Sequence, residues 1–387
     1  KLRRVPPLYR RGRGMAPGPP PANAPGTTGQ WLIDQFAADV RNGQLPQVSY
    51  ICVPTEYCEH PDETPNAGEN FTARLLAALV ANPQVWARTA LVITYDENDG
   101  FFDHMPSVMP PLDSNRGRTT MANATQGEVY QSQPVGLGPR VPTMVVSPWS
   151  KGGRVCSQLF DHTSLIRFTE EWLVQGLGLP RASVQCTSIS PWRRAVCGDL
   201  TSAFDFSASA GEWPTSVPST AVYFKGWGTR DALPPANQTL PRQEAVIGGV
   251  PRRAAPLPYR SAVDGVASGT ARQLSLSFAN TGAVASAFIV YSTLGTDGPW
   301  HYMVEPGKRI DNEAWNWSSN AYHLAVQSEN GFLREFRGSF DGAGRLASVS
   351  LQEDPATATV QLSLRHAGTS TCRFKLVANA YGDRTLL

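Results

Sequence analysis

The hydrophobic pattern of this chain changes part-way along its length, and the change limits which folds it can adopt. Before about residue 206, segments with apolar side chains at helical spacing alternate with short apolar, β-branched runs. From about residue 271, short runs such as QLSLSF and SAFIVYS alternate polar and apolar residues, and turn-forming pairs such as Asn330-Gly331 separate them. We therefore predict an α/β domain with a parallel sheet, followed by an all-β, sandwich-like region.

The first region contains three predicted helices and three predicted strands. The helices are expected at 30–41, 70–81 and 163–177, and the strands at 47–53, 89–94 and 141–146. Strands that alternate with helices are typical of a parallel sheet covered by helices.

The 387 residues are enough for two or three domains that each bury a core. We predict a Pro/Gly-rich basic segment (1–29), the α/β domain (30–206), a linker or wrapped loop (207–258), a sandwich-like domain (259–340) and a second, truncated β domain (341–387).

Composition excludes several classes of protein. A formal net charge of +2 argues against a nucleic-acid partner. No apolar run reaches the length of a transmembrane helix, and no signal-peptide core follows the basic first residues. The six cysteines lack the paired CxxC spacing of a zinc site. Protein partners are not indicated.

The stretch YDENDGFFDH directly follows the predicted strand 89–94 and is the first candidate site. Ligands of open α/β sheets bind at the carboxyl ends of strands. Asp96 and Glu97 offer hard oxygen ligands for a divalent cation, provided that the chain turns at Asn98, Asp99 and Gly100. The alternative is a solvated acidic turn without a ligand.

Three histidines lie at the boundaries of predicted strands or helices. His60 and His104 follow strands, and His162 precedes a helix. A neutral imidazole could bind a metal, contact a phosphate oxygen or protonate a leaving group; the alternative is a surface position. Arg193 and Arg194 could hold a phosphate, although packing of the preceding helix against Trp192 is the commoner explanation for such residues.

Several long blocks resemble the phosphocholine-preferring bacterial phospholipase C family. These blocks are LPQVSYICVPTEYCEHP (45–61), NPQVWARTALVITYDENDGFFDHMP (82–106), GLGPRVPTMVVSPWSKGG (136–153), FDHTSLIRF (160–168), SISPWRRAVCGDLTSAFDF (188–206) and NGFLREFRG (330–338). The resemblance implies an alkaline-phosphatase-like α/β fold and metal-dependent hydrolysis of phosphatidylcholine or sphingomyelin with release of phosphocholine.

The same resemblance assigns roles to residues. It implies that Asp96 and Glu97 bind the metal, for which calcium, zinc and iron are all compatible. It also implies that His60, His104 and His162 line the phosphate site, with His60 contacting the phosphoryl group. A phospholipid at a membrane surface would be the substrate, and the protein would be secreted or periplasmic. A metal-dependent acid phosphatase and a noncatalytic lipid- or surface-binding protein are the alternatives.

The chain also departs from the family. Members carry an amino-terminal half with a Glu-Asn metal-binding pair and a Thr or Ser nucleophile, and these segments have no counterpart in the sequence. We therefore expect the chain to be a carboxyl-side fragment that is catalytically inactive alone.

Overall fold

A computed structural model shows a chain that divides into two compact units. The structure describes residues 29–207 except 62 and 103, residues 253–377 except 296, 342, 355, 356 and 358, and residues 220, 237, 239, 246–247 and 250–251. The first unit comprises Lys1–Phe102, Val141–Val155 and Ala203–Arg253, and the second comprises Asp103–Arg140, Cys156–Ser202 and Ala254–Leu387. Nearly all of the predicted segment 1–29 and most of the predicted linker 207–258 lie outside the described residues.

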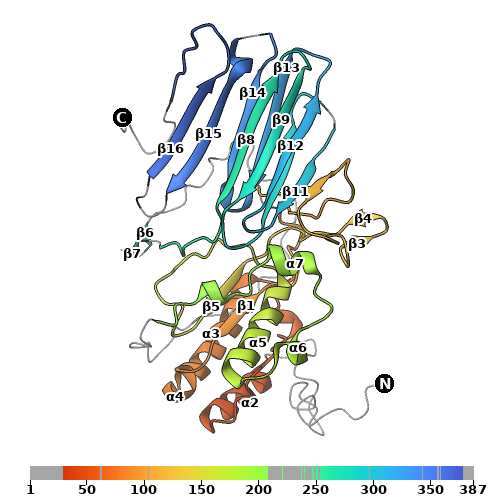
Figure 1. The fold of residues 1–387 in the computed structure, drawn as a ribbon. Helices are drawn as coiled ribbons and strands as arrows, with labels where there is room; N and C mark the ends of the chain where they lie inside the picture. The colour runs from red at the N-terminus through yellow and green to blue at the C-terminus, as the bar shows by residue number, and fades with distance from the viewer. Residues whose placement is uncertain are drawn as a thin grey trace. The chain divides into compact units, whose positions relative to one another are not determined.

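Two helices lie side by side in the first unit, α2 (Gln30–Arg41) and α3 (Pro65–Val80) (Figure 1). The predicted helix 30–41 is confirmed. The predicted helix 70–81 begins five residues earlier, at Pro65, because proline is favoured in the first turn, where its missing N–H is not needed. Side chains at helical spacing, such as Phe71 and Leu75 of α3, form the core between the helices.

The remaining elements of the first unit are short. They are η1 (Thr55–Tyr57), α4 (Pro83–Trp86), β1 (Leu91–Thr94), β5 (Thr143–Val146), β6 (Val246–Ile247) and β7 (Val250–Pro251).

β1 and β5 confirm two predicted strands, but they pair antiparallel, with Leu91 opposite Val146 and Thr94 opposite Thr143. The prediction of a parallel sheet is therefore wrong for this pair. An apolar run of four residues indicates a strand that packs against other parts of the chain, but it does not indicate whether the neighbouring strand runs parallel or antiparallel. That direction depends on the side from which the connecting chain returns.

The predicted strand 47–53 is also wrong. The segment forms no strand, and no other described strand pairs with it. Ile51 and Val53 pack against the helical core, whereas Val48 and Tyr50 are exposed. The apolar pattern therefore reflects contact with helices, and without a partner strand the backbone cannot form a ladder.

Three α-helices of the second unit precede its main sheets: α5 (His162–Leu177), α6 (Arg181–Val184) and α7 (Pro191–Val196). The short 3-10 helices are η2 (Thr201–Ala203, partly in the first unit), η3 (Glu329–Gly331) and η4 (Ala343–Leu346). α5 confirms the predicted helix 163–177 within one residue, and the Asp161 carboxylate caps it by accepting from the Ser164 N–H.

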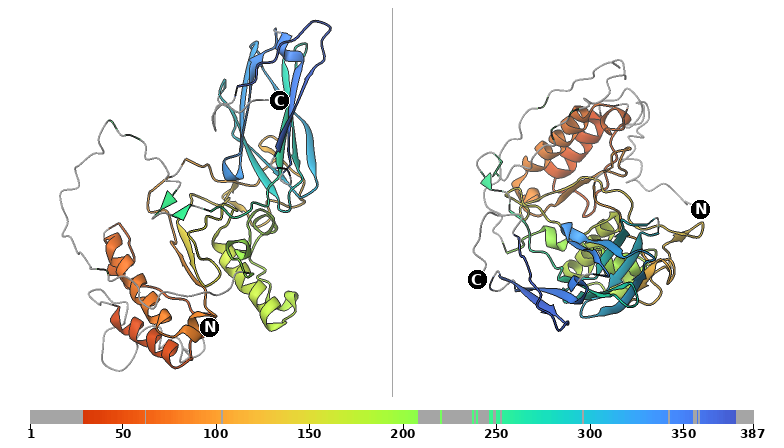
Figure 2. Two further views of the ribbon diagram at one scale, coloured as in Figure 1. Left: turned by 90° about the vertical axis from the view of Figure 1, so that its left-hand side faces the viewer. Right: turned by 90° about the horizontal axis from the view of Figure 1, so that it is seen from above.

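The strands of the second unit form a β sandwich with extra hairpins. They are β2 (Gly117–Thr119), β3 (Val129–Tyr130), β4 (Gln133–Pro134), β8 (Ser261–Ser268), β9 (Gln273–Asn280), β10 (Ser286–Ser292), β11 (Trp300–Val304), β12 (Arg309–Asn316), β13 (Ala321–Ser328), β14 (Leu333–Ser339), β15 (Ala347–Asp354) and β16 (Thr359–His366). A five-stranded sheet in the order β14-β13-β10-β11-β2 faces a three-stranded sheet in the order β12-β9-β8 (Figure 2).

The sandwich core follows from the two-residue period of its strands. Along β9 every second residue is buried, so that Leu274, Leu276 and Phe278 face the opposite sheet. The Phe278 ring stacks on that of Tyr302 with centroids 4.4 Å apart. The predicted sandwich-like fold is therefore confirmed.

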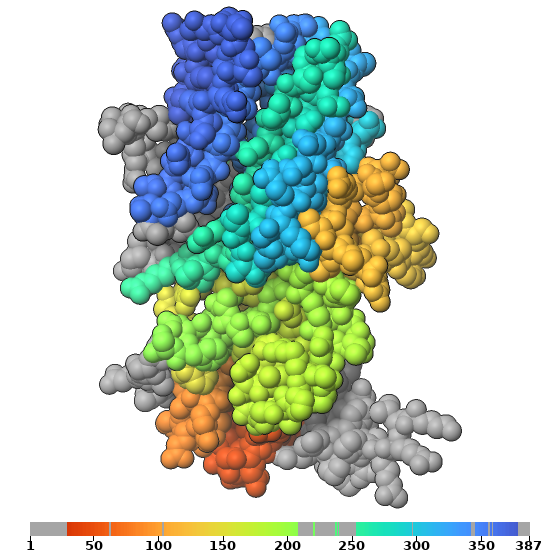
Figure 3. Space-filling view, viewed as in Figure 1, coloured from red at the N-terminus to blue at the C-terminus, as the bar shows by residue number. Residues whose placement is uncertain are grey.

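The outer face of the five-stranded sheet carries a second core. Ala287, Ile289 and Met303 pack there with Trp192 of α7 and with Val108. The segment with β2, β3 and β4, amber in Figure 3, lies against the sandwich strands. This packing explains why parts of the predicted α/β domain belong to the same unit as the sandwich.

β15 and β16 pair as an antiparallel hairpin beside β8. That residues 341–387 begin a second, truncated β domain stays a prediction. Among the described residues, no helix is both long and apolar enough to cross a membrane.

Gly117 is required for the parallel contact between β2 and β11. Its φ is +127°, and a Cβ there would lie 1.8 Å from the His301 carbonyl oxygen. We expect Gly117→Ala to separate the two strands and to lower the free energy of unfolding by about 2 kcal/mol. Urea denaturation measures this loss. Gly307→Ala is the control, because Gly307 also has positive φ but open space around it; equal losses in the two variants would contradict the steric explanation.

Candidate functional site

The chain turns tightly after β1, as the candidate site requires. The Phe101 N–H donates to the Asn98 carbonyl at 2.8 Å, and φ is positive at both Asp99 (54°) and Gly100 (78°). Two consecutive positive φ values are typical of a type I′ turn, which Asn-Asp-Gly sequences favour. Asp96 and Glu97 directly precede this turn, and both side chains are exposed.

A hydrogen bond ties the loop of His60 to the end of β1. The Tyr95 hydroxyl donates to the Glu59 carboxylate, and Glu59 itself has a φ of +63°. Burial, and then the hydrogen bond and charge of Glu59, raise the pKa of Tyr95 to about 12. The exposed His60 therefore follows a residue that contacts the segment carrying Asp96.

Removing the Glu59 charge is expected to lower the pKa of Tyr95. Glu59→Gln keeps the shape of the side chain but loses the negative charge that disfavours the tyrosinate. Ultraviolet difference titration, with Tyr95→Phe to identify the signal of Tyr95, measures the shift. An unchanged midpoint in Glu59→Gln would mean that burial alone raises this pKa.

The described residues supply only part of a metal site. Asp96 and Glu97 are adjacent, exposed carboxylates of the kind that a hard divalent cation binds. Among the described residues, however, no three His, Cys, Asp or Glu side chains form a group that could hold a metal ion. Two donors fall short of the four to eight ligands that such cations take.

His104 and His162 belong to the second unit, and both are exposed. His162 is the first residue of α5, directly after the capping residue Asp161. The structure thus brings the His60 loop beside the Asp96 segment, and it fixes His162 at a helix end. The catalytic and metal-binding roles of these five residues stay predictions.

Arg193 forms a buried ion-pair network and does not remain available for a phosphate. Its Nε donates to Glu128 Oε1 at 2.7 Å and a terminal nitrogen donates to Asp161 Oδ2 at 2.7 Å. The Ser190 hydroxyl donates to the same Glu128 oxygen at 2.6 Å, and the Glu128 side chain is 1% exposed. Arg193 therefore connects α7 to Asp161, which caps α5 and directly precedes His162.

Arg194 also forms an ion pair within the fold. Its two terminal nitrogens donate to the Glu170 carboxylate at 2.8 and 2.9 Å, and this pairing is the main cause that lowers the pKa of Glu170. Both arginines are therefore engaged in ion pairs within the fold, a structural role that neither the packing against Trp192 nor the phosphate interpretation had specified.

Two segments of the chain match known protein families. Residues 13–174 match the phosphoesterase family, and residues 253–339 match the bacterial phospholipase C, C-terminal domain. Residues 13–174 are therefore similar to the phosphoesterase family. The expected resemblance is confirmed, and the second match coincides with the β sandwich.

The chain is also similar to bacterial proteins that are named phospholipases C. A "Non-hemolytic phospholipase C" of Burkholderia pseudomallei (strain K96243) is 44% identical over 374 residues, which is 92% of this chain and 51% of that protein. A protein of the same name from Pseudomonas aeruginosa is 42% identical, and a "Hemolytic phospholipase C" of that organism is 35% identical, each over 92% of this chain. The chain spans about half the length of these relatives.

Sequence reasoning about this phosphoesterase segment missed the acidic residues that organise it. The carboxylates of Glu59, Glu128 and Glu170 accept hydrogen bonds from residues that are at the closest 36, 62 and 16 positions away, respectively. The available signal was the adjacent pair Arg193-Arg194 beside a buried tryptophan, since buried guanidinium groups need carboxylate partners.

Proposed function

We propose that this protein is a phospholipase C that hydrolyses phosphatidylcholine- or sphingomyelin-type phosphodiesters and releases phosphocholine. The observation that carries the proposal is the identity of 44% and 42%, over 92% of the chain, with two proteins named non-hemolytic phospholipase C. The phosphoesterase match over 13–174 supports the reaction class independently.

In this proposal Asp96 and Glu97 contribute oxygen ligands to a divalent cation. When bound, the cation would neutralise charge on the phosphoryl group. The exposure of both carboxylates and the tight turn behind them leave them accessible to such a ligand.

The three histidines are proposed to bind the phosphate ester and to protonate its leaving group. Hydrolysis breaks the bond between phosphorus and the lipid oxygen, and an oxygen that comes from water forms the new bond to phosphorus. The lipid oxygen that leaves must gain a proton. A histidine near neutrality can donate it, and a second can hold the phosphate oxygens by hydrogen bonds. His60 is the candidate for phosphate contact because its loop is held beside the Asp96 segment through Glu59 and Tyr95.

Export to the periplasm or the medium is part of the proposal, since phospholipid substrates lie in membranes. Its support is the likeness to bacterial phospholipases C. Fractionation of the producing cells tests it, and retention of the protein in the cytosol would contradict it.

The reaction is tested with the full-length protein and two soluble chromogenic substrates. We expect hydrolysis of p-nitrophenyl phosphorylcholine, a choline diester, to exceed that of p-nitrophenyl phosphate, a monoester. A faster reaction with the monoester would instead favour the acid phosphatase alternative. A folded protein that binds choline lipid but hydrolyses neither substrate would favour the noncatalytic alternative.

Asp96→Asn and Glu97→Gln are expected to lower kcat/KM for the choline diester by at least about 100-fold, because a lost ligand weakens the cation and its stabilisation of the transition state. Metal content after dialysis should fall in parallel. Asp99→Asn, in the same turn, is the control for general damage to the loop. Full metal content in both ligand variants would exclude the assigned role.

A further inference from the structure

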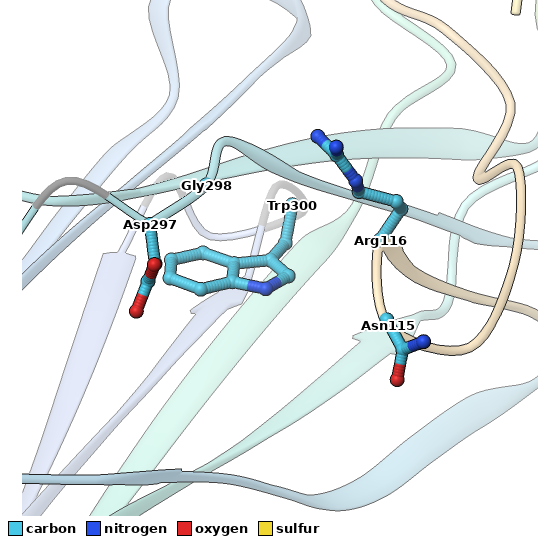
Figure 4. A pocket seen from close by; sticks show the side chains of 5 residues that line it. All are labelled: Asn115, Arg116, Asp297, Gly298 and Trp300. Atoms are coloured by element: carbon cyan, nitrogen blue, oxygen red, sulfur yellow. The ribbon is translucent and has the colours of Figure 1, made fainter. Parts of the chain in front are cut away.

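A pocket in the second unit carries three chemical groups of different kind. It has a volume of about 450 Å³ and is lined by Asn115, Arg116, Asp297, Gly298 and Trp300 (Figure 4). In the figure the Trp300 indole lies between the Asp297 carboxylate on one side and Arg116 with Asn115 on the other. The wall thus presents an anion, an aromatic ring and a cation in sequence.

Backbone hydrogen bonds hold the Arg116 side of the pocket. The Arg116 N–H donates to both the side chain and the carbonyl of Asp113 at 3.1 Å. The Arg116 carbonyl accepts from the His301 N–H at 2.9 Å, next to Trp300 in β11. The two lining segments, far apart in sequence, are therefore fixed to each other.

The Trp300 side is held by packing. The Trp300 ring meets that of Trp315 edge-on, with centroids 5.6 Å apart, which anchors it on the sandwich core. Gly298 approaches so closely that a Cβ there would lie 2.8 Å from the six-membered ring. The indole is therefore restrained and remains partly exposed.

The charged groups of Arg116 and Asp297 do not take part in ion pairs within the described part of the chain. Arg116 and Asp297 are both exposed, and within the described part of the chain neither side chain forms an ion pair or hydrogen bond, with each other or with another residue. This contrasts with Arg193 and Arg194, whose charges are fully engaged. Two opposite charges that have no ion-pair partner among the described residues, beside an aromatic ring, suit a ligand that carries both signs.

We propose that this pocket binds a phosphocholine-type zwitterion, with the quaternary ammonium against Trp300 and Asp297 and the phosphate on Arg116. A quaternary ammonium has no N–H to donate, so ring faces and diffuse negative charge recognise it. A guanidinium binds phosphate oxygens by paired, charge-assisted hydrogen bonds. The choice of ligand rests on the proposed function, since phosphocholine is the product of that reaction.

Calorimetric titration of the 387-residue chain with phosphocholine tests the proposal, with the Trp300 indole resonance as a local probe. We expect saturable binding and a shift of that resonance. Asp297→Asn and Trp300→Phe should weaken binding of both phosphocholine and choline, by roughly tenfold. Arg116→Gln should weaken binding of phosphocholine by a similar factor but leave choline unchanged.

Arg337→Gln and Glu353→Gln are the matched controls. Both residues are exposed charges on other strands of the same unit and do not line the pocket. They should leave both affinities unchanged. If they weaken binding as much as the pocket variants, only net charge matters and the proposal is overturned.

A second arm distinguishes a lipid headgroup from the free molecule. Vesicles of phosphatidylcholine and of phosphatidylglycerol are compared in sedimentation assays with the native chain and Arg116→Gln. Binding of free phosphocholine without preference for phosphatidylcholine vesicles would identify a product site, and a preference lost in the variant would identify a headgroup site.

Absence of phosphocholine binding, or binding that all three pocket variants retain, would overturn the proposal. The outcome is separable from the proposed function. Hydrolysis of the choline diester by full-length protein without binding here would leave the enzyme assignment intact, and binding here without hydrolysis would leave the pocket intact.

Discussion

Replacing Arg193 by leucine is expected to lower the free energy of unfolding of the second unit by about 3–5 kcal/mol. The substitution leaves the Glu128 carboxylate buried at 1% exposure without its cation, and it removes the partner of Asp161 at the cap of α5. Coulombic stabilisation lost at a buried site is not replaced by water. Urea denaturation followed by circular dichroism measures the loss.

Two further variants distinguish the contribution of the buried ion pair to stability from the contribution of side-chain packing. Arg181→Gln breaks an exposed pair with Glu171 and should leave the unfolding midpoint nearly unchanged. Adding Glu128→Gln to Arg193→Leu should recover part of the stability, because a neutral amide costs less to bury than a carboxylate. If the double variant is no more stable than the single one, the burial of the uncompensated charge is not the main cause.

The buried carboxyl group of Glu329 is expected to make stability fall as pH rises from about 4.5 to 7. Burial raises the pKa of Glu329 from its ordinary value of 4.5 to about 7, although hydrogen bonds from Ser328 and the Ala287 N–H partly oppose the shift. Between these two values the folded protein keeps a proton that the unfolded chain has lost, so a higher pH favours unfolding. The expected loss is about 3 kcal/mol and is complete above pH 7.

Glu329→Gln should abolish this dependence. Its amide oxygen can accept from the Ala287 N–H, as Oε1 does at 2.6 Å, and its nitrogen can donate to the Ser328 hydroxyl, which itself donates to the Ala287 carbonyl at 2.8 Å. The variant should therefore be more stable than the native chain at pH 8 and similar at pH 5. Glu353→Gln, at an exposed position, should follow the native curve. A native midpoint that is constant from pH 5 to 8 would contradict the raised pKa.

Much of the secondary structure was predictable because it depends on local burial. Helices 30–41 and 163–177 followed from apolar side chains at helical spacing, and Leu274, Leu276 and Phe278 from alternation along one strand. The turn at Asn98 was predictable from the tolerance of Asp and Gly for positive φ.

The arrangement of these elements was not predictable in the same way. The direction of β1 against β5 and the parallel pairing of Gly117 with His301 depend on contacts between segments far apart in the chain. The apolar residues of 47–53 fitted a strand as well as a contact with helices, and only the position of α2 and α3 distinguished the two.

For the site, the sequence by itself determined the residue types: the carboxylates Asp96 and Glu97 behind a strand, and the resemblance that gives them a role. The tertiary structure decided how the charges are used. It engaged Arg193 with Glu128, it tied Glu59 to Tyr95, and it left Arg116 open in a pocket. The physical reason is that a charge is stabilised by what lies within a few ångströms of it, and residues distant in sequence provide those neighbours only once the chain is packed.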